Sequence, residues 1–275
     1  MRLAFFGDVV GKPGRDVLSA HLPGLKRRLG LDFVVVNAEN AAAGFGITEK
    51  TANDLFEAGA DCLTLGNHSW DQREALSFIE REPRLLRPLN YPRLARAPGR
   101  GAFAYDTPGG GRILVISVLG RVHMDALDDP FSAVDQALEN APLAVAFDAI
   151  IVDIHAEATS EKMAMGHFCD GRASLIVGTH THVPTADAQI LPGGSGYQTD
   201  AGACADYDSV IGMQKAAATQ RFSTRLPTDR LTPATGPATA CGVFVETDPK
   251  TGLAVRIEPI RVGGRLKPHV PEVSG

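Results

Sequence analysis

Residues 32–40 read Asp-Phe-Val-Val-Val-Asn-Ala-Glu-Asn, an apolar run that stops abruptly at a polar cluster. A short apolar run bounded in this way is typical of a buried β-strand. Four more apolar runs end similarly, at Gly7-Asp8, Gly66-Asn67-His68, Asp153-Ile-His155 and Gly178-Thr-His180-Thr-His182. In open α/β sheets, ligands bind beyond the carboxyl ends of the strands. We therefore expect five strands to aim Asp, Glu, Asn and His side chains at one sheet edge.

The remaining pattern predicts an α/β fold. Apolar runs predict strands at residues 3–6, 32–36, 62–65, 102–106, 112–118, 149–154 and 174–177. Helical spacing predicts helices at 14–29, 48–58, 73–80, 131–140 and 161–169, the second from its period rather than from a strong N-cap at Thr48. The glycine-rich residues 108–111 predict a hairpin turn. The tail predicts strands at 186–191, 196–199, 239–246 and 253–261, a helix at 213–222 and an exposed loop at 225–237.

Length and composition limit the class of protein. The 275 residues are 44% hydrophobic and 21% charged, which is typical of a globular chain with one substantial core. We expect a single domain over residues 1–275, with central mixed β-sheets flanked by helices. No apolar run reaches the roughly 18 residues that a membrane helix needs. The start of the chain does not resemble a secretory signal, so we expect a cytoplasmic protein.

Charge and cysteine usage exclude several kinds of site. The net charge of -5 argues against a broad nucleic-acid-binding face, although a metal centre can still attract a small anion. The four cysteines are widely spaced and form no C-x-x-C motif. We therefore expect neither a disulfide framework nor a thiolate zinc site.

The polar clusters together favour a metal centre. Taken alone, Asp8 could cap a helix, Asn67-His68 could form a turn, and His155 could be a structural histidine. His180 and His182 alternate on an extended segment, so both imidazoles can face one point. Five such clusters, each directly after an apolar run, are improbable by coincidence. Oxygen and imidazole ligands without thiolates suit Mn, Fe or Zn and a two-metal hydrolytic site.

The order of these motifs resembles that of the calcineurin-like metallophosphoesterases. Two departures are informative: Val9-Val10 follows Asp8 where that family commonly has Asp-x-His, and Asn37-Ala-Glu-Asn40 replaces a motif that commonly carries Asp. Both departures resemble the YmdB-like branch, a bacterial family of cyclic-nucleotide phosphodiesterases. Further agreement covers residues 7–15, 37–46, 66–71, 153–162, 178–187 and 207–212. The resemblance extends over residues 1–260 and implies a metallophosphoesterase-like fold.

The resemblance also implies a role for each residue of the clusters. Two divalent ions, Fe or Mn with Zn as an alternative, would share Glu39 as a bridging ligand. The shell of one ion would be completed by Asp8, Asn40 and His182, with Asn40 in place of the histidine that Val10 replaces. The shell of the other would be completed by Asn67, His155 and His180. His68 would bind no metal and would protonate the leaving oxygen or stabilise the charged phosphorane.

This chemistry predicts hydrolysis of small phosphodiesters, and the resemblance implies 2',3'-cyclic nucleotides as the substrates. Two cations can clamp phosphate oxygens and activate a bridging hydroxide for in-line attack. The alternatives are a phosphomonoesterase with the same metals and a regulatory nucleotide-binding protein with vestigial activity. An amidohydrolase-type site is disfavoured, because its His-x-His motif would belong to the first strand. Long nucleic acid is not expected as the main substrate, and homo-oligomerisation is expected only from the resemblance.

Some residues near the clusters have two interpretations. Lys12 and Arg15 could contact phosphate, although a solvated helix start is the preferred interpretation. Thr159, Ser160 and Lys162 could line the pocket, and a capped helix entrance explains the Thr159-Ser160 pair equally well. Trp70 could stack on a base, but core packing is its default role. Residues 207–209 could shape the substrate side or form a packed turn.

Overall fold

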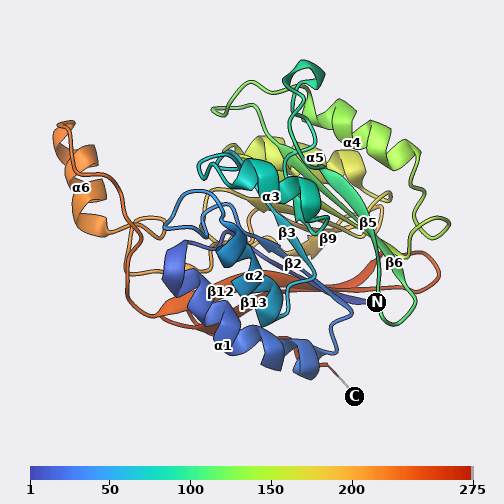
Figure 1. Ribbon diagram of the computed structural model, residues 1–275. Coiled ribbons are helices and arrows are strands. Elements are labelled where there is room, and N and C mark those ends of the chain that lie inside the picture. Colours follow the sequence, from blue (N-terminus) through green and yellow to red (C-terminus); the bar gives the residue numbers. More distant parts are fainter. Residues whose placement is uncertain (274–275) are drawn as a thin grey trace.

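The computed structural model describes residues 1–273, and its elements form four layers (Figure 1). Two β-sheets stack face to face, and helices cover their outer faces. The core between the sheets includes Leu3, Phe5 and Val35 from one sheet and Val115 and Ile151 from the other. The mixed α/β architecture that the sequence predicts is confirmed. The expected domain extends two residues past the described part of the chain.

The first sheet is mixed and has β1 near its centre. Its path is β11-β12-β1-β2-β3-β4, with β13 also paired to β12. The strands are β1 (Arg2–Phe6), β2 (Phe33–Asn37), β3 (Cys62–Thr64), β4 (Leu85–Leu86), β11 (Ala205–Asp206), β12 (Ala238–Thr247) and β13 (Ala254–Gly263). Strands β1 to β4 run parallel, whereas β12 runs antiparallel to β1. The carboxyl ends of β1, β2 and β3 therefore meet at one edge.

The second sheet contains the other two cluster-bearing strands. Its order is β5-β6-β7-β8-β10-β9. The strands are β5 (Ala102–Asp106), β6 (Arg112–Leu119), β7 (Ala149–His155), β8 (Leu175–Thr179), β9 (Gln189–Ile190) and β10 (Gly196–Gln198). The predicted hairpin is confirmed, because β5 and β6 pair antiparallel across the glycine-rich turn. Strands β6, β7 and β8 run parallel, so their carboxyl ends lie together.

Helices cover the outer face of each sheet. Against the first sheet lie α1 (Gly11–Leu29), α2 (Glu49–Ala58) and α3 (Ala75–Arg81), and against the second lie α4 (Pro130–Glu139) and α5 (Thr159–Cys169). A single turn of 3-10 helix spans Arg93–Ala95. Helix α6 (Lys215–Thr224) projects away from the layers (Figure 1) and buries only Ala218. No helix among residues 1–273 combines the length and apolar character needed to cross a membrane.

The element boundaries differ from expectation in a few places. Helix α2 has a complete capping box, because the Thr51 hydroxyl reaches back to the Thr48 amide and serves as well as a longer acidic side chain. The strand expected at 186–191 shrinks to β9, since Asp187 turns to bind the Thr199 amide and hydroxyl. Strands β4 and β11 were not predicted because two residues carry too little periodicity to detect.

Candidate metal centre

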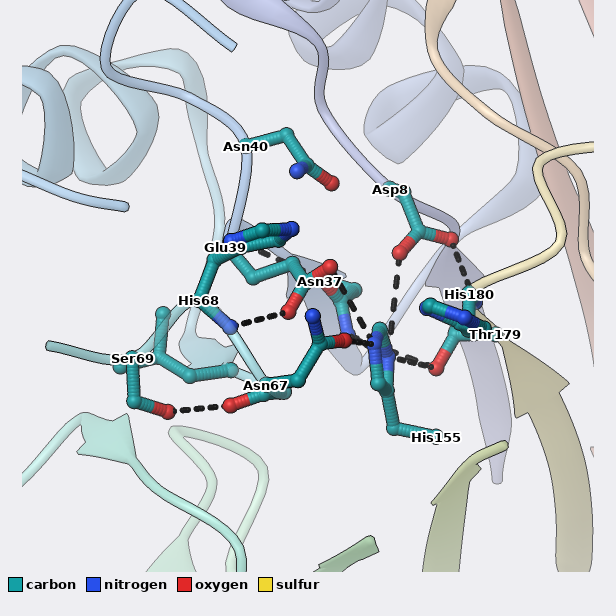
Figure 2. A network of polar contacts seen from close by, with 12 residues as sticks. Asp8, Asn37, Glu39, Asn40, Asn67, His68, Ser69, His155, Thr179 and His180 are labelled. Atoms are coloured by element: carbon teal, nitrogen blue, oxygen red, sulfur yellow. Dashed lines mark hydrogen bonds and ion pairs between the residues drawn. The ribbon is translucent and has the colours of Figure 1, made fainter. Parts of the chain in front are cut away.

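The five polar clusters lie together where the two sheets meet (Figure 2). Asp8, Glu39 and Asn67 follow β1, β2 and β3 of the first sheet. His155 ends β7, and the His180–His182 segment follows β8 of the second sheet. The expectation that all five strands share one sheet edge is wrong. Two stacked sheets present their carboxyl edges to the same space, because each sheet's parallel strands end on that side.

Two groups of potential metal ligands overlap at one carboxylate. Asp8, Glu39 and His182 each offer one ligand atom, and these atoms lie within 4.8 Å of one another. Glu39, His155 and His180 form a second group by the same measure. Glu39 therefore belongs to both groups, at the position expected for a bridging ligand. The side chains come from both sheets, so the fold itself brings the groups together.

Two buried oxygen atoms show that the centre suits cations. Asp8 Oδ1 and Asn40 Oδ1 have no hydrogen-bond partner within residues 1–273. The Asn40 amide donates to the Gly44 carbonyl at 3.0 Å, which leaves Oδ1 facing the centre (Figure 2). Buried acceptors without donors are costly unless another partner satisfies them. Divalent metal ions are such partners, because they bind carboxylate and amide oxygens.

Glu39 is held as a carboxylate. Its Oε2 accepts the backbone amide of His68 at 3.1 Å, and its Oε1 lies 3.2 Å from His155 Nε2. Burial opposes the charged form, but His155 and His68 outweigh it and lower the pKa of Glu39 to about 2. Gly66 leaves room for this contact, because a Cβ there would overlap both the Glu39 carboxylate and the His155 ring. The carboxylate that the two ligand groups share therefore carries a negative charge.

His155 is oriented by a chain of hydrogen bonds behind it. Its Nδ1 lies 2.9 Å from the Thr179 hydroxyl, which donates to Asp153 at 2.7 Å. Its Nε2 faces Glu39 and lies 3.0 Å from Asn67 Oδ1. Burial lowers the pKa of His155, but Glu39, Asp8 and Asp153 overcome that effect and raise it to about 9. Support behind a ligating imidazole fixes the ring and its tautomer.

His182 has its tautomer set by a backbone carbonyl. Its Nδ1 lies 2.7 Å from the Ile211 carbonyl, which can only accept, so Nδ1 carries the proton. Its Nε2 is then free to bind a metal and lies 3.8 Å from Asp8 Oδ1. His180 packs its ring against His155, with centroids 4.9 Å apart, and burial together with His155 lowers the pKa of His180 to about 3. His180 is therefore a neutral imidazole, and His182 directs its Nε2 toward Asp8.

The segment that carries these histidines is strained and supported from below. His180 and His182 have φ values of 93° and 64°, in a region that non-glycine residues seldom adopt. The extended conformation expected for residues 180–182 is therefore wrong, and each imidazole belongs to a different ligand group. Thr181, between them, donates its amide and hydroxyl to Asp200 Oδ2 at 3.1 and 2.6 Å. Lys162 also reaches Asp200, at 2.7 Å, and both side chains are fully buried. Lys162 thus supports the site from behind. The capped helix entrance considered for Thr159 and Ser160 is wrong, because α5 begins at Thr159 after Ala158 without a side-chain cap.

His68 lies at the mouth of the centre without joining either ligand group. Its Nδ1 is 2.8 Å from Asp71 Oδ2, and its side chain is 27% exposed. The ring meets Phe45 edge to face, with centroids 5.2 Å apart. The Asp71 contact orients the imidazole and leaves Nε2 free to contact a bound molecule.

For four features near the centre the sequence left two possible roles, and the contacts in the structure show which role each has. Lys12 is solvated, as preferred, and pairs with Asp16. The preference for a solvated Arg15 is wrong, because its side chain is 17% exposed and donates to the Ala41 carbonyl, bracing the loop that carries Asn40. Trp70 packs against the core, and residues 207–209 form a packed turn in which the Tyr207 hydroxyl lies 3.2 Å from the His182 carbonyl.

Several supporting residues escaped sequence reasoning. Asn37, Asp153 and Thr179 form the hydrogen-bonded layer behind His155 and Glu39. Asp153 carried a detectable signal, since it is a carboxylate inside an otherwise apolar strand. No comparable sequence signal marks Asp200, because it follows a short strand and its partner Lys162 is 38 residues away.

Comparisons with known proteins agree with the motif order. A model of the YmdB-like protein family matches residues 4–260. A 2',3'-cyclic-nucleotide 2'-phosphodiesterase from Bacillus subtilis (strain 168) is 45% identical over 95% of this chain and 97% of its own. A crystal structure of a novel phosphatase from Mycoplasma pneumoniae superposes with a TM-score of 0.89 and 35% identity, covering 96% of this chain and 93% of that one.

A second solved structure agrees closely. A hypothetical protein from Thermus thermophilus is 42% identical and has a TM-score of 0.88, and the match covers 96% of this chain and 100% of that one. These likenesses span both sheets and every polar cluster of the centre. The chain therefore belongs to the YmdB-like protein family.

Proposed function

We propose that this protein is a metal-dependent phosphodiesterase that hydrolyses 2',3'-cyclic nucleotides. The observation that carries the proposal is the presence of Glu39 in both groups of potential ligands. One carboxylate shared by two ligand groups suits a two-metal hydrolytic site. The Bacillus subtilis relative, described as a 2',3'-cyclic-nucleotide 2'-phosphodiesterase, supports the choice of substrate.

Seven side chains would hold two divalent ions, Fe or Mn, with Zn as an alternative. Glu39 would be shared, and the remaining ligands would be Asp8, Asn40 and His182 for one ion and Asn67, His155 and His180 for the other. When bound, the ions would polarise the phosphate and activate the attacking water. The mixed oxygen and imidazole set favours these metals over soft thiophilic ions.

His68 would supply the proton for the leaving oxygen. Its Nδ1 contacts Asp71 at 2.8 Å, so its Nε2 is the nitrogen available to substrate. A histidine can donate a proton near neutral pH, and such general-acid help is worth about 10²- to 10⁴-fold in rate. The buried carboxylates and imidazoles behind it keep the ligands oriented while this proton moves.

We also propose that residues 1–275 form one catalytic domain and that it acts in the cytoplasm. The core between the sheets joins residues from Leu3 to Ala254, which supports a single domain. All four cysteines are free and buried, a usage that suits a reducing compartment. Long nucleic acid is not proposed as the main substrate, and a homo-oligomer stays an expectation.

Substrate comparison tests this proposal against its two alternatives. The metal-loaded protein would be incubated with 2',3'-cyclic AMP and, separately, with 2'-AMP and 3'-AMP, and the products resolved by chromatography. A diesterase converts the cyclic diester to a monophosphate and leaves the monoesters intact. Faster release of inorganic phosphate from the monoesters would identify a phosphomonoesterase. Recovery of bound, unchanged 2',3'-cyclic AMP at full metal occupancy would identify a nucleotide-binding regulator.

A further inference from the structure

A cavity of about 480 Å³ lies beside the metal centre and has no part in the proposed chemistry. It is bounded by Phe45 and by the arm, residues 214–232, which carries α6 (Figure 1). Backbone contacts hold the two ends of the arm together. The Gln214 amide donates to the Thr232 carbonyl at 2.8 Å, and Met213 forms a β-bridge with Pro233. The cavity is therefore open to solvent and lies between two separate parts of the chain.

A continuous row of side chains connects this cavity to His68. The Phe45 ring meets the His68 ring at 5.2 Å, and the Arg230 guanidinium lies 5.5 Å from the Phe45 ring centroid. Phe45 is held in place by Gln72, which donates to its backbone carbonyl at 2.8 Å. A molecule at His68 can therefore extend over Phe45 and reach Arg230.

The charges that line the cavity favour an anion. Arg221 and Arg230 both line it, both are exposed, and neither has a carboxylate partner within residues 1–273. Asp229 lies on the same wall and offsets one of the two charges. Most other arginines of this acidic protein form ion pairs or bind carbonyl groups. A guanidinium suits phosphate because its planar donors match two phosphate oxygens at once.

The size of the cavity also suits part of a nucleotide. Small-molecule sites commonly occupy about 300 to 1,000 Å³, so this one can hold a sugar-phosphate unit. Phe45 offers an apolar surface between the reacting phosphate and the two arginines. These features point to a second anionic group on the substrate, one sugar away from the reacting diester.

We propose that the cavity binds a second phosphate of the substrate, through Arg230 and Arg221, while the cyclic phosphate reacts at the metal centre. This inference rests on the proposed phosphodiesterase activity and narrows its substrate class. The second phosphate can come from the 5'-phosphate of a mononucleotide or from the first internal phosphate of a short oligonucleotide. Both sources present non-bridging phosphate oxygens to the arginines, with up to two negative charges on the monoester and one on the diester.

Steady-state kinetics of the metal-loaded full chain test the subsite. Three substrates are compared: adenosine 2',3'-cyclic phosphate, the same nucleotide with a 5'-phosphate, and a dinucleotide that ends in a 2',3'-cyclic phosphate. We expect one or both extended substrates to gain about threefold to tenfold in kcat/KM, chiefly through KM, since the arginines are exposed. The gain should shrink as salt screens the contact. A gain confined to one extended substrate identifies the source of the phosphate.

Matched arginine variants show whether the gain comes from this cavity. Arg230→Gln and Arg221→Gln should each reduce the gain in kcat/KM of the extended substrates toward onefold, which means no gain. Arg225→Gln is the control, because Arg225 is exposed on the same arm but does not line the cavity, and it should keep the gain. No gain for either extended substrate, or an equal gain in Arg230→Gln and Arg225→Gln, would overturn the proposal.

A binding measurement separates this inference from the proposed activity. Calorimetry would compare adenosine 3',5'-bisphosphate with adenosine 3'-monophosphate on the same metal-loaded protein. Tighter binding of the bisphosphate, lost in Arg230→Gln but kept in Arg225→Gln, supports the subsite even if no cyclic nucleotide is hydrolysed. Equal affinity for the two ligands contradicts it even if hydrolysis is fast.

Discussion

Lys162 Nζ lies 2.7 Å from Asp200 Oδ2, and both side chains are fully buried beneath the His180–His182 segment. Asp200 also accepts the amide and hydroxyl of Thr181, so one ion pair fixes the residue between two candidate ligands. A buried ion pair is costly to break, because the remaining charge loses its partner. The pair therefore acts as a positioning device for the metal centre.

Lys162→Met is expected to destabilise the protein by about 3–5 kcal/mol, since it leaves Asp200 charged and unpaired in the core. It should also weaken metal binding, because Thr181 loses its fixed anchor. Urea unfolding and metal titration measure the two effects. Lys26→Met is the control, because the Lys26–Asp61 pair has side chains 29% and 32% exposed and removing such a pair costs about 1 kcal/mol or less. Unchanged metal affinity in folded Lys162→Met would disprove the positioning role.

Asn40→Ala is expected to weaken binding of one ion by tenfold or more. The change removes the Asn40 Oδ1 atom, which has no hydrogen-bond partner within the described residues. Asn90→Ala provides a matched control, because Asn90 is an equally buried amide whose Oδ1 accepts the Leu119 amide and whose nitrogen donates to the Leu119 carbonyl, so it offers no unpartnered oxygen. A metal titration monitored by calorimetry should show weaker metal binding only in Asn40→Ala. A similar loss in both variants would indicate general destabilisation instead of ligand removal.

His68→Ala is expected to retain both metals and to slow turnover by about 10²- to 10⁴-fold, since the proposed proton donor is lost. Metal content by elemental analysis and kcat on 2',3'-cyclic AMP measure the two properties. His167→Ala, at an exposed position on α5, should change neither. The general-acid role fails if His68→Ala keeps full metal content and the wild-type rate.

Metal affinity is expected to rise with pH up to about 9. In the metal-free protein the neighbouring carboxylates raise the pKa of His155 to about 9, so at neutral pH the imidazole holds a proton that a metal must displace. Because the pKa of His155 is higher in the folded protein than its ordinary value, the His155–Glu39 contact stabilises the metal-free fold at low pH. This stabilisation is lost as the pH rises through about 9. Calorimetry in buffers of different ionisation enthalpy would detect the released proton. Affinity that is flat from neutral pH to about 9 would contradict this account.

Sequence reasoning located the centre because each cluster follows a strand directly. A buried parallel strand is a nearly continuous apolar run. The change from Val36 to Asn37 therefore marks the end of β2 and can be recognised in the sequence alone. The spacing of His180 and His182 identified two imidazoles of the centre, although the extended conformation expected for that segment does not form. Eight residues spread over 175 positions could therefore be assembled into one hypothesis.

Tertiary relationships lay beyond this reasoning. Nothing local distinguishes one sheet edge from two stacked edges, because the pairing of β1 with β2 and of β7 with β8 is long-range. The Ile211 carbonyl that sets the tautomer of His182 is a backbone atom, which any residue type would supply. The approach of Arg230 to Phe45 depends on the path of the arm, which has no apolar periodicity to read.

The most direct test of the account is a metal titration with activity as the readout. Protein stripped with a chelator would be reloaded anaerobically with Mn²⁺ or Fe²⁺, and bound metal and 2',3'-cyclic AMP hydrolysis would be measured at each step. We expect two ions per chain, no activity without metal, and loss of the second ion in Glu39→Gln. Full hydrolysis by the stripped protein, or saturation of metal binding and activity at one ion per chain, would contradict it.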